Sequence, residues 1–134
     1  MDRLLQGKTI VITGASRGIG KAIAAVCARE GANVGINYLT GAAPAAELAA
    51  ELQRAHGIAA HPLGFDVRKP ESIARACEPL LRHAGIDAWV NNAAINLQGL
   101  LLSQTEQDIL EQVSTNITGP IHCCRFILKH MLER

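Results

Sequence analysis

Three regularly spaced glycines follow a short apolar run near the start of the chain. The run covers residues 10–12, and the glycines are Gly14, Gly18 and Gly20. Glycine can adopt a positive φ where a strand ends, lets backbone N–H groups approach an anion, and permits a helix to pack closely on a strand. Because a helix N-terminus favours negative charge, this strand, turn and helix predict a site for the pyrophosphate of a dinucleotide such as a nicotinamide cofactor.

The region after these glycines, residues 17–30, has the pattern of an amphipathic helix. Its apolar side chains recur at helical spacing, which predicts that they face the core: Ile19, Ile23, Val26 and Cys27.

Strand and helix patterns alternate along the whole chain. Strands are expected at residues 9–13, 33–38, 59–66 and 88–91, and helices at 17–30, 44–56 and 70–84. This alternation predicts an α/β fold of the Rossmann type, a doubly wound parallel sheet covered by helices, in one domain over residues 1–134. Pro62 falls within the third strand, where its missing N–H is tolerated at a sheet edge, as in the strand order 3-2-1-4.

Two further prolines bear on the helices. Pro79 removes a backbone hydrogen bond inside the third helix and predicts a kink or a break there. The segment 105–134 is expected to be helical, bent or broken around Gly119-Pro120, and to cover the sheet beside the fourth strand. Its predicted apolar face consists of Ile109, Val113, Ile117, Ile121, Phe126, Ile127 and Met131.

The composition excludes several classes of partner. Thirteen basic and twelve acidic side chains give a net charge of +1, so no basic field suits nucleic acid and no charge run suits a membrane surface. No apolar segment approaches the roughly 20 residues of a membrane span, and the N-terminus lacks a signal-peptide core, so we expect a soluble, cytoplasmic protein. The four cysteines lack C-x-x-C spacing and are expected to be reduced and largely buried, and the five histidines form no metal-ligand pattern.

Four motifs in order resemble the short-chain dehydrogenase/reductase family, and within it the 3-oxoacyl-acyl-carrier-protein reductases and related small ketone or alcohol oxidoreductases. The motifs are Thr13-Gly14-Ala15-Ser16-Arg17-Gly18-Ile19-Gly20, Asp66-Val67, Asn91-Asn92-Ala93-Ala94 and Asn116. The resemblance covers essentially the whole chain but about the first half of the family's fold, which implies a sheet truncated after about four strands. It implies this cofactor-binding set: Gly14, Ser16, Arg17, Gly18, Ile19, Gly20, Tyr38, Asp66, Val67, Asn92, Ala93 and Ala94.

The resemblance also implies individual roles. Asp66 would accept a hydrogen bond from the adenine amino group, with Val67 against the ring; the alternative for Asp66 is a carboxylate that caps the following turn. Asn92, with its neighbour Asn91, would fix the fourth strand and line the cofactor crevice. Ala94 stands where the family usually has glycine, which could narrow the freedom of the backbone there.

Asn116 would correspond to the catalytic asparagine that holds a proton-relay water in the family. The alternative is a mid-helix asparagine that bonds to backbone and bends the helix.

The end of the second strand indicates which nicotinamide cofactor is bound. NAD-specific versions of this fold carry an acidic residue there, whereas this chain has Tyr38, flanked by Asn37 and Leu39. None of these repels a 2′-phosphate, and Arg17 in the glycine turn can bind one. NADP(H) is therefore expected to be preferred, with NAD(H) as the alternative.

The family's chemistry needs a serine, a tyrosine and, four residues after the tyrosine, a lysine. The single tyrosine of the chain, Tyr38, is followed four residues later by Ala42, so no Tyr-x-x-x-Lys is present. We therefore expect these 134 residues to be inactive alone, with a small carbonyl or alcohol as substrate in the full-length form. A second copy or a related family subunit is the expected partner, and a non-catalytic module that binds NADP(H) or such a partner is the alternative function.

Overall fold

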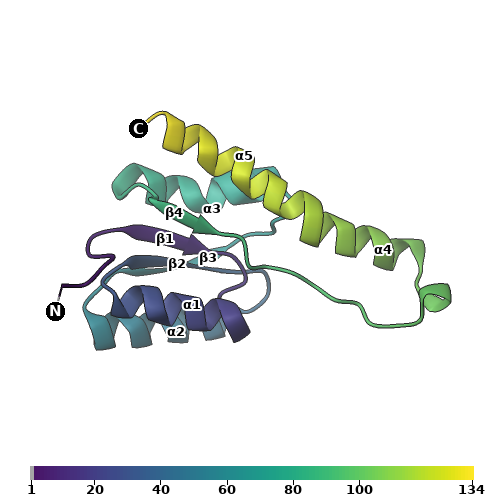
Figure 1. Ribbon diagram of the computed structural model, residues 1–134, viewed down its shortest axis with the longest axis horizontal. Helices are drawn as coiled ribbons and strands as arrows, with labels where there is room; N and C mark the ends of the chain where they lie inside the picture. Colours follow the sequence, from purple (N-terminus) through teal and green to yellow (C-terminus); the bar gives the residue numbers. More distant parts are fainter. Residues whose placement is uncertain (1) are drawn as a thin grey trace.

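A parallel four-stranded sheet with helices on both faces makes up the body of the structure, a computed structural model that describes residues 2–134 (Figure 1). The strand order is β3-β2-β1-β4. The strands are β1 (Thr9–Ile12), β2 (Asn33–Tyr38), β3 (Ala60–Gly64) and β4 (Ala88–Val90). This confirms the predicted α/β fold and its 3-2-1-4 order.

The helices form one layer on each side of the sheet. Helices α1 (Gly18–Arg29) and α2 (Ala42–His56) cover one face, and α3 (Pro70–His83) and α5 (Gly119–Leu132) cover the other (Figure 1). Alternate side chains of β1 point to opposite faces of the sheet. Ile10 and Ile12 belong to the first core, between the sheet and helices α1 and α2. Val11 belongs to the second core, between the sheet and helices α3 and α5. Burial on both faces explains why the strand sequence is continuously apolar.

The thiols confirm part of the expectation for the cysteines. Cys77 on α3 and Cys123 on α5 are buried in the second core, whereas Cys27 and Cys124 are partly exposed. Burial, with a smaller contribution from a neighbouring thiol, raises the pKa of Cys77 and of Cys123 to about 12. These two thiols are therefore protonated and unreactive at neutral pH.

Helix α1 buries only part of the predicted face. Ile23 and Cys27 pack against the core, whereas Ile19 is 75% exposed and Val26 is 48% exposed. The buried residues are Gly20, Ala24 and Ala28, one turn apart. Small residues let the helix axis approach the sheet, so close packing selects this face over the one with larger apolar side chains.

The prolines in β3 and α3 are both accommodated on exposed surfaces. Pro62 lies on the edge strand, opposite Ile36 of β2, as predicted. Pro79 does not break α3, which is helical from Pro70 to His83, so that alternative was wrong. Pro79 and Arg75 are exposed, so the carbonyl group that loses its helical partner can be hydrated.

The C-terminal helical segment consists of several parts. A 3-10 turn (η1, Leu101–Ser103) precedes α4 (Glu106–Val113), and a π-helical turn (η2, Ser114–Thr118) joins α4 to α5. The prediction of a bend or break at Gly119-Pro120 is therefore replaced by a change of helical pitch just before it. Pro120 lies in the first turn of α5, where a missing N–H is tolerated.

The predicted apolar face of this segment is buried only in its C-terminal part. Ile127 is buried and Phe126 and Met131 pack against the second core, beside β4 as expected. However, Ile109, Val113, Ile117 and Ile121 are 40–56% exposed. For Ile109 and Val113 the reason is that α4 extends past the end of the sheet and has no layer beneath it (Figure 1). Among residues 2–134, no helix is long and apolar enough to cross a membrane.

Candidate cofactor-binding site

The glycine turn between β1 and α1 has the geometry that its spacing predicts. Gly14 and Gly18 have φ values of 62° and 59°, in the left-handed region that favours glycine. No atom lies within 4 Å of where a Gly18 side chain would begin, so the backbone there is open to a ligand. No side chain caps α1, which leaves its first N–H groups available to an anion.

Gly20 is enclosed on every side by the turn. A Cβ atom there would collide with the carbonyl oxygen of Gly14, and it would lie 2.6 Å from Asn92 Nδ2 and 2.9 Å from Ala15 Cα. The third glycine therefore permits the close contact between α1 and the strand ends.

Thr13 and Asn92 join the ends of β1 and β4. The Thr13 hydroxyl accepts hydrogen bonds from the N–H groups of Asn92 and Ala93, both at 2.9 Å. The Asn92 amide donates to the carbonyl oxygens of Thr13 at 2.9 Å and Gly14 at 3.2 Å. The predicted role of Asn92 in fixing the fourth strand matches these contacts. Asn91 is exposed, and its Oδ1 accepts from Trp89 Nε1 at 3.1 Å.

Asn37 holds the same turn from the other side, a role that sequence analysis missed. It is 3% exposed, and its Oδ1 accepts from the Gly14 N–H at 2.9 Å. Its Nδ2 lies 3.1 Å from the carbonyl oxygens of both Leu63 and Phe65, and 3.2 Å from that of Tyr38. The available signal was an amide within an otherwise apolar buried strand, which must find partners when it is buried.

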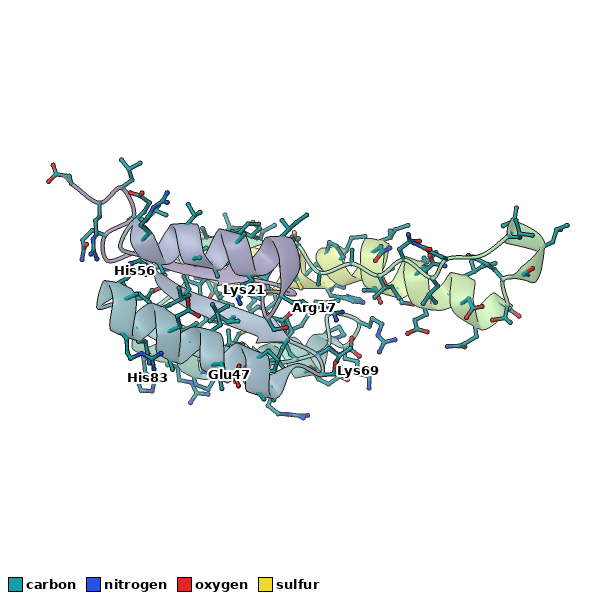
Figure 2. All side chains as sticks on the ribbon, turned by 90° about the horizontal axis from the view of Figure 1, so that it is seen from below. Arg17, Lys21, Glu47, His56, Lys69 and His83 are labelled. Atoms are coloured by element: carbon teal, nitrogen blue, oxygen red, sulfur yellow. The ribbon has the colours of Figure 1, made fainter. Side chains whose placement is uncertain are left out.

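The remaining predicted residues of the turn, Ser16, Arg17 and Ile19, lie around its opening. Arg17 is exposed, and among residues 2–134 it forms no ion pair. Figure 2 shows Arg17 at the same end of the molecule as Lys69, opposite the end that carries His56 and His83. The Ser16 hydroxyl lies beside the loop after β2, 2.9 Å from where a Gly41 side chain would begin.

Tyr38 ends β2 but turns toward β3. Its hydroxyl is 2.8 Å from where a Gly64 side chain would begin, and its ring packs on the first core. The position therefore carries no negative charge, as the sequence indicates, while the phenol itself lies over the neighbouring strand.

Asp66 lies just after β3 and is buried, with a side chain that is 10% exposed. Arg68 donates hydrogen bonds to both oxygens of this carboxylate, from Nε to Oδ1 at 3.0 Å and from Nη2 to Oδ2 at 2.8 Å. The Arg68 N–H also donates to Oδ1 at 3.0 Å, which is the turn-capping contact weighed as the alternative role. The hydrogen bonds from Arg68 hold the pKa of Asp66 below its usual value, although burial opposes them.

Val67, Ala93 and Ala94 occupy different environments. The Val67 side chain is buried in the second core and lies 2.8 Å from where a Gly119 side chain would begin. Ala93 covers Gly14, with its Cα 3.0 Å from the position of a Gly14 Cβ. Ala94 is exposed and has a negative φ, so its backbone does not require the glycine that the family usually has.

Asn116 lies in the π-helical turn and holds the loop after β4. Its Oδ1 accepts from the Ile95 N–H at 2.8 Å, and its Nδ2 donates to the Ile95 carbonyl at 2.7 Å. The side chain therefore bonds to backbone, as the alternative interpretation proposes, although to another segment rather than to its own helix. A single π-helical turn within an α-helix often marks a functional site.

These residues suit a dinucleotide. The open turn at Gly18 and the uncapped helix offer N–H donors for phosphate, Arg17 offers a free cation, and the carboxylate of Asp66 offers an acceptor for an amino group. Residues 2–134 contain no cluster of His, Cys, Asp and Glu side chains that could hold a metal ion.

Comparisons with known proteins point to one family. The family described as short chain dehydrogenase matches residues 8–134. The chain is 34% identical over 128 residues to a 3-oxoacyl-acyl-carrier-protein reductase from Staphylococcus epidermidis, covering 95% of this chain and 52% of that protein. It is 34% identical over 131 residues to 3beta-hydroxysteroid dehydrogenase 1 from Eggerthella lenta, covering 97% and 50%.

A solved structure shares the fold at similar identity. A short chain dehydrogenase from Burkholderia cenocepacia, in complex with NADP, superposes with a TM-score of 0.88 at 35% identity, covering 94% of this chain and 51% of that one. The chain thus spans about half the length of the relatives it matches. On the family match over residues 8–134 and the shared sheet topology, the chain belongs to the short-chain dehydrogenase/reductase family.

Proposed function

We propose that these residues form a single nucleotide-binding domain, residues 1–134, that holds the cofactor of an NADP(H)-dependent oxidoreductase. The observation that carries this proposal is the glycine turn, which Asn37 and Asn92 hold open from two strands while α1 presents uncapped N–H groups. The pyrophosphate would lie at Gly18 and Ile19, and the adenine amino group would reach the carboxylate of Asp66. When bound, the nicotinamide would donate a hydride to a carbonyl carbon or accept one from the carbon of the corresponding alcohol.

The preference for NADP(H) rests on Arg17 and on the uncharged end of β2. Arg17 forms no ion pair among the described residues, so its guanidinium is free to bind a 2′-phosphate. The solved relative from Burkholderia cenocepacia binds NADP, which supports the same choice. The preference is for NADP(H) over NAD(H), which lacks that phosphate.

Titration of the purified protein with NADPH and NADH, followed by nucleotide fluorescence, tests the assignment. Arg17→Ala is expected to weaken NADPH binding by roughly tenfold or more and NADH binding little, because only NADPH carries the extra phosphate. The matched control is Lys21→Ala, one turn further along α1 (Figure 2). Equal losses for both nucleotides would contradict the preference, and binding of neither by the unaltered protein would contradict the proposed function.

Asn116 is the candidate member of the catalytic set. Its side-chain amide is occupied by Ile95, so its contribution would be to fix the loop that follows Asn92-Ala93-Ala94 beside the nicotinamide. A water for proton relay would then be held by groups of the π-helical turn other than this amide.

A polypeptide limited to these residues has no Tyr-x-x-x-Lys motif for proton transfer, so we expect it to bind the cofactor without turnover. The substrate of the whole enzyme would be a small carbonyl or alcohol compound. The alternative function is a non-catalytic module that binds NADP(H) or a partner subunit, and the exposed apolar side chains of α4 and α5 favour it. Reductase activity with added carbonyl compounds would exclude this alternative.

A second copy of the chain, or a related subunit, is the proposed partner of that exposed helical surface. Its apolar residues are Ile109, Leu110, Val113, Ile117, Ile121, Leu128 and Leu132. Helix α4 carries the acidic side chains of Glu106 and Asp108, and α5 carries the basic side chains of Arg125 and Lys129. Two such segments in antiparallel arrangement would bring opposite charges together.

A further inference from the structure

We infer that Arg68 is a positioning residue that makes Asp66 select a 6-amino purine over a 6-oxo purine. The inference rests on the proposed function, because it assumes that a purine dinucleotide is bound at this site. It concerns a residue two positions after Asp66 whose contacts place it between two carboxylates.

The guanidinium of Arg68 divides its nitrogens between two elements. Nε and Nη2 contact the Asp66 carboxylate, at 3.0 Å and 2.8 Å. Nη1 points toward Glu111 of α4 at 3.8 Å. The side chain of Arg68 is 32% exposed, against 10% for Asp66, so the cation covers the carboxylate and fixes its orientation.

The hydrogen bonds from Arg68 occupy most of the acceptor sites of the Asp66 carboxylate. An ionised carboxylate has about four lone-pair sites, and it accepts but never donates. Oδ1 already accepts from the N–H and from Nε of Arg68, both at 3.0 Å. Oδ2 accepts from Nη2 at 2.8 Å and has a longer contact of 3.2 Å with Nε. Nε has a single hydrogen, which its shorter contact directs to Oδ1, so Oδ2 is the atom with room for one more donor.

The rest of the surroundings keeps this acceptor in place. The Asp66 N–H donates to Ser72 Oγ at 2.8 Å, which ties the residue to the first turn of α3. Asp66 also lines a hollow together with Leu39 after β2 and with Lys69, Glu71 and Arg75 on the α3 side. A purine placed in this hollow would meet an ionised carboxylate, which attracts an amino group and repels a carbonyl oxygen.

A pair of dinucleotides tests this selection: NADPH and its hypoxanthine analogue, in which a carbonyl replaces the amino group at purine C6 and N1 carries a hydrogen. Dissociation constants are measured for the unaltered protein and for Arg68→Ala, Arg68→Lys and Arg75→Ala. The unaltered protein should bind NADPH roughly tenfold or more tightly than the analogue, as expected when a buried charged acceptor meets a donor in one ligand and a carbonyl in the other.

Arg68→Ala should reduce that ratio severalfold or more, because the carboxylate loses its fixed orientation. Arg68→Lys keeps the positive charge but not the two-pronged guanidinium, so its ratio should fall between those of the unaltered protein and Arg68→Ala. Arg75→Ala removes a cation that lines the hollow but has no hydrogen bond to Asp66, and its ratio should not change. Damage to the fold would weaken both nucleotides equally and leave the ratio intact, so the ratio separates positioning from a general structural role.

The outcomes also separate the two proposals. If the unaltered protein binds both nucleotides equally, or if Arg68→Ala keeps the preference, the role of Arg68 is overturned while the proposed function stands. If the unaltered protein binds neither nucleotide, the proposed function fails and this inference fails with it.

Discussion

The backbone at Gly20 has no room for a side chain. A methyl group there would collide with the Gly14 carbonyl and approach Asn92 Nδ2 to 2.6 Å. We expect Gly20→Ala to lower the free energy of unfolding by about 2–3 kcal/mol, since backbone atoms cannot yield as side chains do. Urea denaturation measures the change. Gly99→Ala is the matched control, because its new methyl group would meet only Gln104 Cγ at 4.0 Å. Equal stability of the two variants would contradict the prediction.

The contact between Arg68 and Asp66 predicts a loss of stability in acid. The pKa of Asp66 is lower in the folded protein than its ordinary value of about 3.9. The folded state therefore binds this proton more weakly than the unfolded state. The stabilisation is complete above the ordinary pKa and disappears as the pH falls through the lowered one.

Asp66→Asn provides the comparison for this pH dependence. The difference in unfolding free energy between the two proteins should be constant from pH 7 to about pH 5 and should shrink at lower pH, as measured by urea denaturation. The groups that face the carboxylate are Arg68, Lys69 and, through Arg68, Glu111. A difference that stays constant down to pH 2 would exclude a lowered pKa for Asp66.

The roles of residues that depend on local chain geometry could be predicted from the sequence. The roles of residues that depend on contacts between distant segments could not. Gly14, Gly18 and Gly20 have their expected conformations because a turn is a local structure. Asn37 meets Gly14 only after two strands pair, and Arg68 meets Glu111 only after α4 takes its place past the end of the sheet. Neither contact leaves a signature in residue spacing.

At the scale of single elements, Pro79 is the clearest departure from ideal structure. It lies inside α3, on an exposed position, and the helix continues through it. Pro79→Ala should raise the free energy of unfolding by about 2 kcal/mol, because the restored N–H outweighs the extra freedom of the unfolded chain. Thermal or urea unfolding measures the gain. Pro70→Ala, in the first turn of the same helix, should change stability little. A similar effect of both substitutions would contradict this explanation.

Element boundaries were predicted best where apolar runs have clear ends. Strand β2 covers residues 33–38 as expected, whereas β3 ends two residues early, at Gly64. The faces of helices were predicted less well. Periodicity identified α1, but it could not show that Ala24 and Ala28 would pack on the sheet in place of Ile19. That choice depends on the distance between helix and sheet, which is a tertiary property.

At the scale of the whole molecule, α4 and part of α5 extend beyond the layers that would cover them (Figure 1). The exposed apolar side chains there, with Ile121 at 52% exposure near the middle, predict self-association. Among residues 2–134, β4 pairs with β1 alone, so its other edge is a second surface for pairing. We therefore expect marginal stability for a monomer of these residues.

Sedimentation at several concentrations tests the helical surface. Ile121→Glu should shift the protein toward the monomer, by a factor of roughly ten or more in the dissociation constant, because it places a charge in an apolar contact. Leu4→Glu is the control, since Leu4 is 85% exposed and belongs to the segment before β1, which is not part of this surface. A protein that is monomeric at high concentration, or that responds equally to both substitutions, would contradict association through α4 and α5.

The buried amide of Asn37 limits how the nucleotide preference of this chain could be redesigned. A carboxylate at the end of β2 is the usual device for recognising a ribose 2′-hydroxyl. At position 37, however, Asp would replace the amide nitrogen, a donor, with a carboxylate oxygen. That oxygen would face three carbonyl oxygens in the core, all of them acceptors. Position 38 is partly exposed, so a carboxylate there could be hydrated. Evolution or engineering toward NAD(H) is therefore confined to a single side chain of this strand, next to one that cannot change.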